Sequence, residues 1–462
     1  MAVRVLLVVW LFFAAPAAAQ PFTAAETARV DSIVAAALAR SGIPAVSVAV
    51  VRGGKVALTK AYGRQSPGEA ATPEARYPIA SVSKQFVAAA LLLLEDEGRL
   101  SLDDPVAKYL PGIAGAERMT IRQLLAHSSG LTDYWPQDYG FANMAQPVTP
   151  RQILDRWARH PDFPAGTDFR YSNTGYVAAG LIAEKVAGAP LMEVLRRRLF
   201  APLRLAAIDM DDAQGPGFPT PAKRYALGPV RAETPAARGW LYAAGGLAMS
   251  AADLARWNIA RLDRTLLPAE DWQAQETPQP LSDGRSANYG LGVVLGERHG
   301  LATVEHSGEA VGFLTQNIVV PSRRVAVTVL VNGAFGAAQE EIADGILAML
   351  LAPPPAEDDQ GRIADARALL DQLRAGRADP ALLTDHLRAF FTPEALADYR
   401  SSLSPLGEPA ALALARPPSV RGGFVQRVYT LTFPDGRRLV IGTFAEPGAH
   451  GRWEQFLVTP GS

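Results

Sequence analysis

The feature that most constrains the fold is a stretch from about Ser81 to Glu97 that has a helical pattern and is apolar on all sides. A helix of this kind has no face suited to water, so we expect other elements to bury it completely. Gly98 marks its end. The chain has 462 residues, which is enough to bury such a helix and, at about 150 residues per domain, predicts two or three domains.

Strand signals stand on both sides of this helix and of a mostly helical middle region. A helix at 24–41 precedes a hairpin formed by 45–51 and 55–61, and a further helix is expected at 174–187. Strands return at 289–295, 313–320 and 325–332, before a closing helix at 337–350. Sequential hairpins imply an antiparallel sheet. We therefore predict an α+β domain over 20–352, with helices flanking the sheet and a mostly helical insert.

The chain changes character after this domain. Consecutive prolines and acidic residues begin at Pro353, and this composition predicts a stiff, solvated linker over 353–369. Helical segments and four strand-like segments follow, with a turn signal at Pro434-Asp435-Gly436. We predict a small α+β accessory domain over 370–462.

The first residues resemble a secretory signal peptide. Arg4 precedes a short apolar stretch and small residues, and we expect cleavage after Ala19, giving a signal peptide at 1–19. The stretch is shorter than the roughly 20 residues of a membrane span. The expected protein is therefore exported, periplasmic or secreted, with no stable membrane anchor after processing.

Composition excludes several functions. The formal net charge is −1 and the chain contains no cysteine. No basic excess exists to neutralise phosphates, so nucleic acid is not an expected partner. Without cysteine, disulfides, thiolate metal sites and a cysteine nucleophile are ruled out. We find no metal-binding or nucleotide-binding motif and expect neither a metal nor a cofactor.

Ser81-Val82-Ser83-Lys84 is the first candidate for chemistry. Positions i and i+3 of a helix share a face, so the Ser81 hydroxyl and the Lys84 amine can come within hydrogen-bonding distance. Burial beside an apolar helix lowers the pKa of a lysine, which lets it act as a base. The alternative is an N-cap serine beside a solvated lysine.

Two further motifs carry suitable side chains. In Tyr171-Ser172-Asn173, the tyrosine can move protons if a nearby cation such as Lys84 lowers its pKa, and the asparagine can hold both an amine and a substrate amide. In His306-Ser307-Gly308, the glycine lets a substrate backbone approach a strand. The backbone N–H groups of Ser81 and Glu309 together predict an oxyanion hole. The alternatives are a helix cap with a packed tyrosine, and a surface histidine near a turn.

The order and spacing of these motifs resemble the serine β-lactamase and penicillin-binding-protein superfamily. More narrowly, the chain resembles its class C β-lactamase-related branch, the peptidase S12-like group of aminopeptidases, carboxypeptidases and esterases. The resemblance covers about residues 25–350. Surrounding segments are also typical of this branch: Pro78-Ile79-Ala80, 100–106, 109–111, 124–131 and 243–247.

This resemblance implies a role for each matching residue. Ser81 is the acylated nucleophile, Lys84 is its base or the partner of the base, and Tyr171 protonates the leaving group and activates the deacylating water. Asn173 positions the substrate and Lys84. The segment formed by His306, Ser307 and Gly308 lines the edge strand beside the substrate. A small-molecule or peptide substrate and a Ser81 acyl-enzyme follow from these roles.

One departure concerns the third motif. Many β-lactamases and transpeptidases have Lys-Thr-Gly there, and the lysine helps to hold a substrate carboxylate. His306 stands in that place here, and a neutral imidazole attracts a carboxylate poorly. The change weakens the expectation of efficient β-lactam hydrolysis and leaves D-amino-acid peptides and esters open. A catalytically weak, penicillin-binding sensor with the same fold is the alternative to an enzyme.

Two other segments near the motifs have plainer interpretations. His127 follows a short predicted helix, and we interpret it as a structural residue that holds a turn by hydrogen bonds. Trp240-Leu241-Tyr242 is predicted either to wall an apolar cleft or to pack in the core.

Overall fold

The structure, a computed structural model, describes residues 21–135, 142–351, 357–421, 424–446, 448 and 451–461. The expected signal peptide at 1–19 and the start of the expected linker, 353–356, lie outside these ranges. The chain divides into two compact units, Met1–Leu350 and Leu351–Ser462, close to the domain boundary expected at 352.

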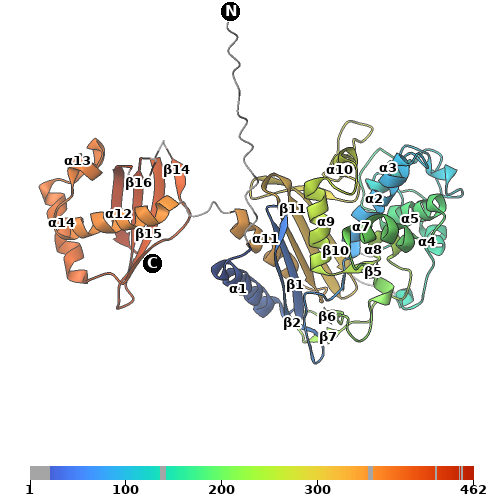
Figure 1. Cartoon of the computed structure of the whole chain (residues 1–462), viewed down its shortest axis with the longest axis horizontal. Coiled ribbons are helices and arrows are strands. Elements are labelled where there is room, and N and C mark those ends of the chain that lie inside the picture. The colour runs from blue at the N-terminus through green and yellow to red at the C-terminus, as the bar shows by residue number, and fades with distance from the viewer. Residues whose placement is uncertain are drawn as a thin grey trace, which may run out of the picture. The chain divides into compact units, whose positions relative to one another are not determined.

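The first unit is built on an antiparallel sheet whose strands come from both ends of its sequence (Figure 1). The strand order is β3-β2-β1-β12-β11-β10-β9. The first strand pairs directly with the last, and Val46 lies opposite Val331. The strands of this sheet are β1 (Ala45–Arg52), β2 (Lys55–Ser66), β3 (Glu69–Ala70), β9 (Val294–Arg298), β10 (Leu301–Ala310), β11 (Phe313–Val320) and β12 (Val325–Val331).

Helices cover both faces of this sheet (Figure 1). On one face, α1 (Ala24–Ser41) and α11 (Ala338–Leu351) pack together, with Ile33 of α1 beside Gly345 of α11. On the other face, α9 (Ala251–Asp263) contacts β1, β2 and β12. Most side chains of β1 and all of those of β12 are buried, as expected for central strands covered on two sides.

The helical insert lies beyond α9 and surrounds α2 (Lys84–Asp96), the predicted apolar helix. Most side chains of α2 are buried, and its neighbours include α5 and α10. Thr120 and Thr149 each form the capping box that the sequence predicts. The helices are α3 (Ile121–Leu125), α4 (Pro150–Trp157), α5 (Asn173–Ala187), α6 (Leu191–Leu195), α7 (Ala201–Leu203), α8 (Tyr242–Gly245) and α10 (Ala269–Gln275).

Short elements connect these helices. They comprise the small strands β4 (Tyr77–Pro78), β5 (Ile208–Asp209), β6 (Ala222–Arg224), β7 (Val230–Ala232) and β8 (Leu247–Met249). They also include the single turns η1 (Ala80–Ser83), η2 (Val106–Lys108), η3 (Ala142–Ala145), η4 (Arg196–Phe200), η5 (Met210–Asp212) and η6 (Pro321–Arg323).

The strand predicted at 289–295 is wrong over most of its length. Gly292 has a φ of +81°, which interrupts an extended strand, and β9 begins only at Val294. Gly290 lies against the carbonyl of Gln275 instead. Contacts with α10 and α2 therefore decide the conformation of this segment, and a single sequence does not show them.

The second unit packs one helix-covered sheet around its own core. The sheet order is β13-β15-β16-β17, and β14 also pairs with β15. Leu369, Leu370 and Leu373 of the first helix pack with Tyr429, Ile441 and Phe456 of the sheet. The elements are α12 (Glu357–Arg374), η7 (Pro380–Leu382), α13 (Asp385–Phe390), α14 (Pro393–Leu403), η8 (Ser404–Leu406), β13 (Ala411–Leu414), β14 (Ser419–Arg421), β15 (Phe424–Thr432), β16 (Arg438–Ala445) and β17 (Trp453–Pro460).

The predicted linker over 353–369 is wrong from Glu357 onward, because α12 starts there. Acidic residues suit the first turn of a helix, where the helix dipole is positive. Asp359 is buried rather than solvated and forms an ion pair with Arg427 of β15, with 2.8 Å between Oδ1 and Nε.

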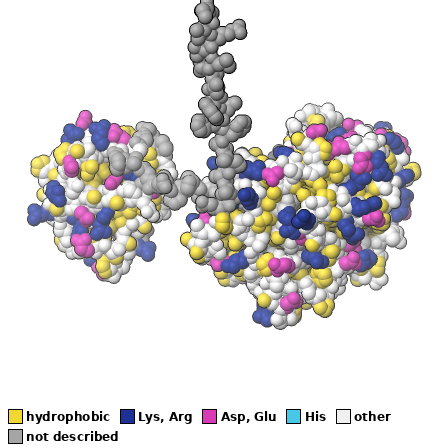
Figure 2. All heavy atoms as spheres, in the orientation of Figure 1, with side chains coloured by type: hydrophobic (Ala, Val, Ile, Leu, Met, Phe, Trp, Pro, Cys, Tyr) yellow, Lys and Arg dark blue, Asp and Glu magenta, His cyan; other side chains and the backbone are white. Residues whose placement is uncertain are grey.

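Surface charge agrees with the near-zero net charge. Basic and acidic side chains are interspersed on the visible face of each unit (Figure 2). Among the helices of the described ranges, none is long and apolar enough to cross a membrane.

Candidate active site

Ser81 lies in a tight turn that leads into the buried helix. The turn η1 continues directly into α2, which begins at Lys84. Ala80, the residue before Ser81, has a φ of +47°, a conformation that costs free energy for any residue except glycine. A Cβ on Gly245 would lie 3.2 Å from the backbone carbon of Ala80, so α8 approaches the turn closely. The position of Ser81 is therefore set by backbone packing.

Lys84 is fully buried and bonded to three acceptors. Its Nζ lies 3.0 Å from the Ser81 Oγ, 2.8 Å from the Asn173 Oδ1 and 2.5 Å from the carbonyl oxygen of Ala244. Burial lowers the pKa of the Lys84 amine to about 7, and the charge of Asp133 opposes that shift. The amine is therefore poised to gain or lose a proton near neutral pH.

These three contacts define what the amine does in each protonation state. A charged amine donates one hydrogen to each acceptor. A neutral amine keeps two hydrogens, and the carbonyl oxygens of Asn173 and Ala244 can only accept. Both hydrogens go to those two carbonyls, so the lone pair of the neutral amine faces the Ser81 hydroxyl. In that state Ser81 donates its proton to Lys84, which is the arrangement of a nucleophile and its base.

Asp133 fixes the orientation of Asn173, and the sequence analysis missed it. The Asp133 carboxylate accepts hydrogen bonds from the backbone N–H of Asn173 at 2.9 Å and from its Nδ2 at 3.3 Å. The amide oxygen of Asn173 therefore points to Lys84. Burial raises the pKa of the Asp133 carboxyl, and the hydrogen bonds it accepts from Asn173 and Trp135 oppose this. The available signal was an acidic residue directly before Tyr134 and Trp135, just after the 124–131 motif.

Tyr171 joins this group through both Ser81 and Lys84. The Lys84 Nζ lies 4.9 Å from the centre of the Tyr171 ring. Burial raises the pKa of the Tyr171 phenol, and the neighbouring Ser81 hydroxyl opposes that shift. The expectation that a nearby cation such as Lys84 lowers the pKa of Tyr171 is therefore wrong, because the burial of the phenol dominates its pKa. Tyr171 is therefore a neutral phenol, which can give up its own proton while it receives another from a neighbouring group.

The strand β10 brings the third motif to the nucleophile turn. β9 pairs with β10 only as far as Glu305, so from His306 onward one edge of β10 is left for η1, which it contacts. A Cβ on Gly308 would lie 2.3 Å from the carbonyl oxygen of Ile79. Gly308 thus permits close approach of the turn before Ser81. Ser307 and Glu309 alternate with it and are exposed.

His306 is buried and neutral. Burial, and to a smaller extent the charge of Lys84, lowers the pKa of the His306 imidazole to about 4. Its Nε2 lies 2.9 Å from the Tyr289 hydroxyl and its Nδ1 lies 2.5 Å from the carbonyl oxygen of Ser307. The ring centres of His306 and Tyr171 are 6.2 Å apart. His306 therefore belongs to the site but contributes no positive charge there.

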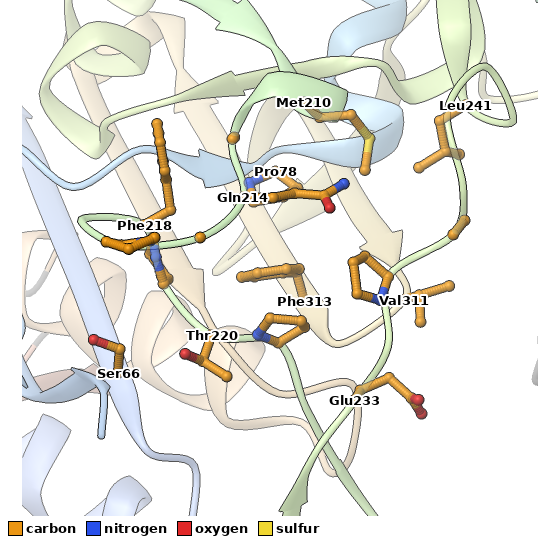
Figure 3. Close-up of a pocket in the computed structure, with 17 residues that line it drawn as sticks. Ser66, Pro78, Met210, Gln214, Phe218, Thr220, Glu233, Leu241, Val311 and Phe313 are labelled. Atoms are coloured by element: carbon orange, nitrogen blue, oxygen red, sulfur yellow. The ribbon is translucent and has the colours of Figure 1, made fainter. Parts of the chain in front are cut away.

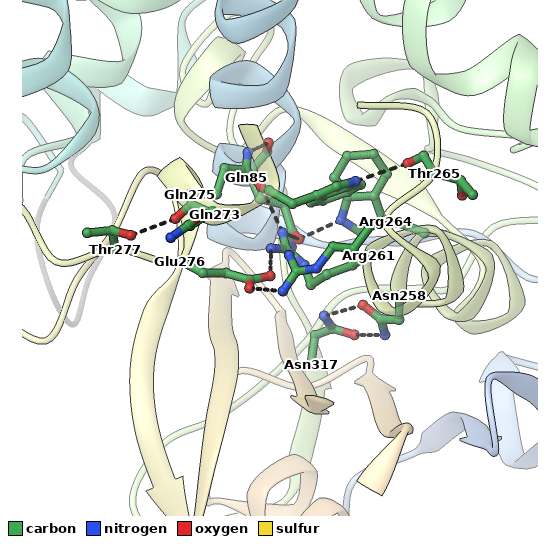
Figure 4. Close-up of polar contacts among 12 residues, drawn as sticks. Gln85, Asn258, Arg261, Arg264, Thr265, Gln273, Gln275, Glu276, Thr277 and Asn317 are labelled. Carbon is green, nitrogen blue, oxygen red and sulfur yellow. Dashed lines mark hydrogen bonds and ion pairs between the residues drawn. The ribbon is translucent and has the colours of Figure 1, made fainter. Parts of the chain in front are cut away.

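A buried polar cluster of Arg261, Gln275 and Gln85 supports the segment that follows Lys84 (Figure 4). Arg261 of α9 donates to the side-chain oxygens of Gln85 at 3.1 Å and of Gln275 at 2.9 Å. Gln275 in turn donates to the backbone carbonyl of Gln85 at 2.8 Å. A Cβ on Gly292 would lie 2.8 Å from the backbone carbon of Lys84. These contacts fix the start of α2, and the sequence analysis identified none of them.

An apolar pocket of about 370 Å³ is lined in part by Pro78, which precedes the nucleophile turn by two residues (Figure 3). Phe313 and Val311, at the turn between β10 and β11, line one side, and Leu241 lines another. Leu241 also packs against Gly245, the glycine that contacts Ala80. Of the two interpretations of Trp240-Leu241-Tyr242, lining an apolar cleft therefore applies to Leu241. Five prolines stiffen the walls: Pro78, Pro216, Pro219, Pro221 and Pro235.

The described side chains form no group of three histidine or acidic residues that could hold a metal ion. The functional groups assembled around Ser81 are an amine, a phenol, an amide and a neutral imidazole. An activated hydroxyl beside a buried amine, on this fold, defines a serine nucleophile site of the β-lactamase and transpeptidase type.

Comparison with known proteins agrees with this class. The Beta-lactamase family model matches residues 30–350, and the chain belongs to that family. The match confirms the resemblance to the serine β-lactamase and penicillin-binding-protein superfamily and its class C-related branch.

Individual relatives extend the comparison. The D-aminopeptidase of Brucella anthropi is 30% identical over 345 residues, which are 70% of this chain and 61% of the relative, so the chain spans about three fifths of the length of that protein. The D-stereospecific amidohydrolase of Streptomyces sp. is 27% identical, with a TM-score of 0.60 over 68% of this chain and 96% of that structure. The octameric penicillin-binding protein homologue of Pyrococcus abyssi shares the fold, with 21% identity and a TM-score of 0.61 over 94% of this chain and 99% of that structure.

Proposed function

We propose that the protein is a serine hydrolase that cleaves amide or ester bonds through an acyl-enzyme on Ser81. The observation that carries this proposal is the contact between the Ser81 hydroxyl and the Lys84 amine. The other two partners of this amine are the carbonyl oxygens of Asn173 and Ala244, which can only accept hydrogen bonds. A hydroxyl placed against the lone pair of a buried amine is an activated nucleophile.

The reaction begins when the Ser81 oxygen attacks the substrate carbonyl carbon and its proton passes to Lys84. The resulting oxyanion is stabilised by the backbone N–H groups of Ser81 and Glu309. Tyr171 gives its proton to the leaving group and receives the proton that Lys84 took up. The bond between the carbonyl carbon and the leaving group then breaks, which leaves an ester on Ser81. Water attacks that ester by the same steps in reverse, which frees the acid and Ser81.

The substrate class is inferred from the absence of a positive charge at His306 on β10 and from the named relatives. His306 is neutral and hydrogen-bonded to Tyr289, so it offers no cation to a carboxylate beside the scissile bond. We propose amides and esters of D-amino acids as substrates, supported by the relatives named D-aminopeptidase and D-stereospecific amidohydrolase. We also propose that the apolar pocket at Val311 and Phe313 takes a bulky apolar side chain of the substrate.

A substrate panel on the purified protein tests the proposal. It contains the p-nitroanilides of D-phenylalanine, D-alanine and L-phenylalanine, a p-nitrophenyl ester and a chromogenic cephalosporin. We expect hydrolysis of the D-phenylalanine anilide and the ester, and a loss of at least 10³-fold in Ser81→Ala and Lys84→Ala. Full hydrolysis of every cleaved substrate by Ser81→Ala contradicts the mechanism. An acyl adduct that forms and never hydrolyses indicates a penicillin-binding sensor instead.

We also propose that the protein is exported after cleavage behind Ala19. The support is the sequence alone: one positive charge at Arg4, a short apolar stretch and small residues before Gln20. Expression of the full chain in a Gram-negative host, followed by fractionation and intact mass measurement, tests this. Recovery of only the uncleaved chain in the cytoplasm contradicts it.

A further inference from the structure

His127 lies at the end of α3, in the segment that passes behind Tyr171. It is buried and has a φ of +58°, a left-handed conformation that is uncommon for residues other than glycine but that asparagine, aspartate and histidine adopt more often than most. The sequence analysis gave it only the task of holding a turn. Its contacts show which segment it holds.

His127 accepts two backbone hydrogen bonds, one from the residue before Tyr171 and one from the residue after it. The backbone N–H of Arg170 donates to the carbonyl oxygen of His127 at 2.9 Å. The backbone N–H of Ser172 donates to the Nδ1 of the His127 ring at 3.1 Å. One residue therefore accepts the N–H groups immediately before and after Tyr171, which leaves the Tyr171 backbone little freedom to move.

The His127 ring also packs against the phenol itself. The ring centres of His127 and Tyr171 are 4.1 Å apart, with 34° between the ring planes. Tyr289, the hydrogen-bonding partner of His306, lies on His127 as well, with ring centres 4.6 Å apart. His127 thus contacts two aromatic side chains of the candidate site, Tyr171 and Tyr289.

The protonation state of His127 follows from these contacts. A nitrogen that accepts a hydrogen bond carries no hydrogen, so Nδ1 is bare. Burial and, to a smaller extent, the charge of Lys84 lower the pKa of the His127 imidazole well below its usual value, so the ring is neutral and its hydrogen sits on Nε2. Among the described residues, no hydrogen-bonding partner is found for Nε2. A single, fixed tautomer keeps Nδ1 available to Ser172 at all moderate pH values.

We propose that His127 is a positioning residue for Tyr171, which holds the phenol beside Ser81 and Lys84 so that it can pass a proton to the leaving group. This inference rests on the proposed hydrolase function. It assigns His127 no contact with the substrate, because the side chain is buried and its Nδ1 and carbonyl oxygen are bonded to the 170–172 backbone. Its loss should impair the steps that need Tyr171 and spare those that do not.

The test compares two substrates with the same acyl group, a p-nitroanilide and a p-nitrophenyl ester. An aniline leaving group must be protonated as it departs, whereas p-nitrophenolate leaves without a proton. Tyr171→Phe is the reference, and should lower kcat/KM for the anilide by at least 10²-fold and for the ester much less. His127→Ala should show the same pattern, with a loss of about 10²-fold on the anilide, the effect expected of a displacement of about 1 Å.

Three further variants separate positioning from general damage. In His127→Asn, the Oδ1 occupies the place of Nδ1 and asparagine tolerates a positive φ, so it should recover most of the anilide activity lost in His127→Ala. His127→Ala combined with Tyr171→Phe should be no worse than Tyr171→Phe alone, since both act on one step. Ile182→Val, a buried change further along α5, should leave the anilide-to-ester ratio unchanged.

The outcomes are distinguishable. If Tyr171→Phe leaves the anilide rate intact, the proposed role of Tyr171 fails. If Tyr171→Phe is impaired but His127→Ala affects both substrates equally, or adds fully to Tyr171→Phe, the positioning role is overturned. Nitrogen NMR of the wild-type protein with labelled histidine gives a test that needs no variant: one ring should stay in the Nε2–H form from pH 5 to 9. Titration of every histidine ring in that range also overturns the inference.

Discussion

Gly308→Ala tests whether the contact between β10 and the nucleophile turn is required for catalysis. The added Cβ would lie 2.3 Å from the carbonyl oxygen of Ile79, whereas ordinary contacts start at 3.4 Å. Both groups belong to backbone, so no side chain can rotate away. The strand or the turn must therefore move by about 1 Å. Glu309, whose N–H is the second proposed oxyanion donor, is the next residue and moves with the strand.

A displacement of this size should weaken one oxyanion donor, which costs about 10²-fold in rate, or about 3 kcal/mol of barrier. We expect kcat/KM to fall by that factor for both the anilide and the ester, because every acylation passes through an oxyanion. The dependence of kcat/KM on pH should keep its inflection, since the contact between Ser81 and Lys84 lies within η1 and α2.

The control is Gly361→Ala, on α12, where an added Cβ meets no atom within 4 Å. It should leave turnover unchanged and slightly stabilise its helix. Thermal unfolding of both variants separates catalytic loss from loss of fold. If Gly308→Ala hydrolyses both substrates within threefold of the wild type, the tight contact is not required and the assignment of β10 to the oxyanion hole is wrong.

Three further predictions follow from the charges described above. Only neutral Lys84 accepts the Ser81 proton and burial lowers its pKa to about 7, so kcat/KM should fall about tenfold for each pH unit below that value; a profile flat down to pH 5 contradicts this role. Asp133→Asn removes a charge that raises the pKa of Lys84, so the inflection of kcat/KM with pH should move to lower pH by about one unit. Asp103→Asn, on the surface, should leave that inflection in place. An upward shift in Asp133→Asn would contradict this effect of the Asp133 charge. Asp359→Ala removes the buried carboxylate that pairs with Arg427, and should lower the free energy of unfolding of the second unit by about 3 kcal/mol in urea. Asp371→Ala, in an exposed ion pair, should change that free energy by less than about 1 kcal/mol. Equal effects of the two substitutions would contradict the importance of burial.

Features that depend on nearby residues were predictable from the sequence. The capping boxes at Thr120 and Thr149 need only residues three positions apart, and the contact between Ser81 and Lys84 needs one helical turn. The antiparallel sheet with a helical insert was predicted as well, because hairpin patterns and helical periodicity are local signals.

Features that depend on remote segments were not predictable in this way. Gly292 and Arg261 support the start of α2 from more than 170 residues away, and nothing in their own neighbourhoods indicates this. The acidic run at Glu357–Asp359 has the composition of a linker, yet it begins a helix whose Asp359 is buried against Arg427. The direction of the Tyr171 pKa shift likewise depends on burial, which only the packed structure shows.

The pairing of β1 with β12 has a consequence for biosynthesis. Val46 and Val331 are neighbours in the sheet but leave the ribosome about 285 residues apart, an interval of about 15–60 s at usual rates of translation. Until then, β1 is paired with β2 on one side only, and the edge that will face β12 stays open. The nascent chain must therefore carry exposed strand edges for most of its synthesis, and a chaperone that shields them would determine how much protein reaches its folded state.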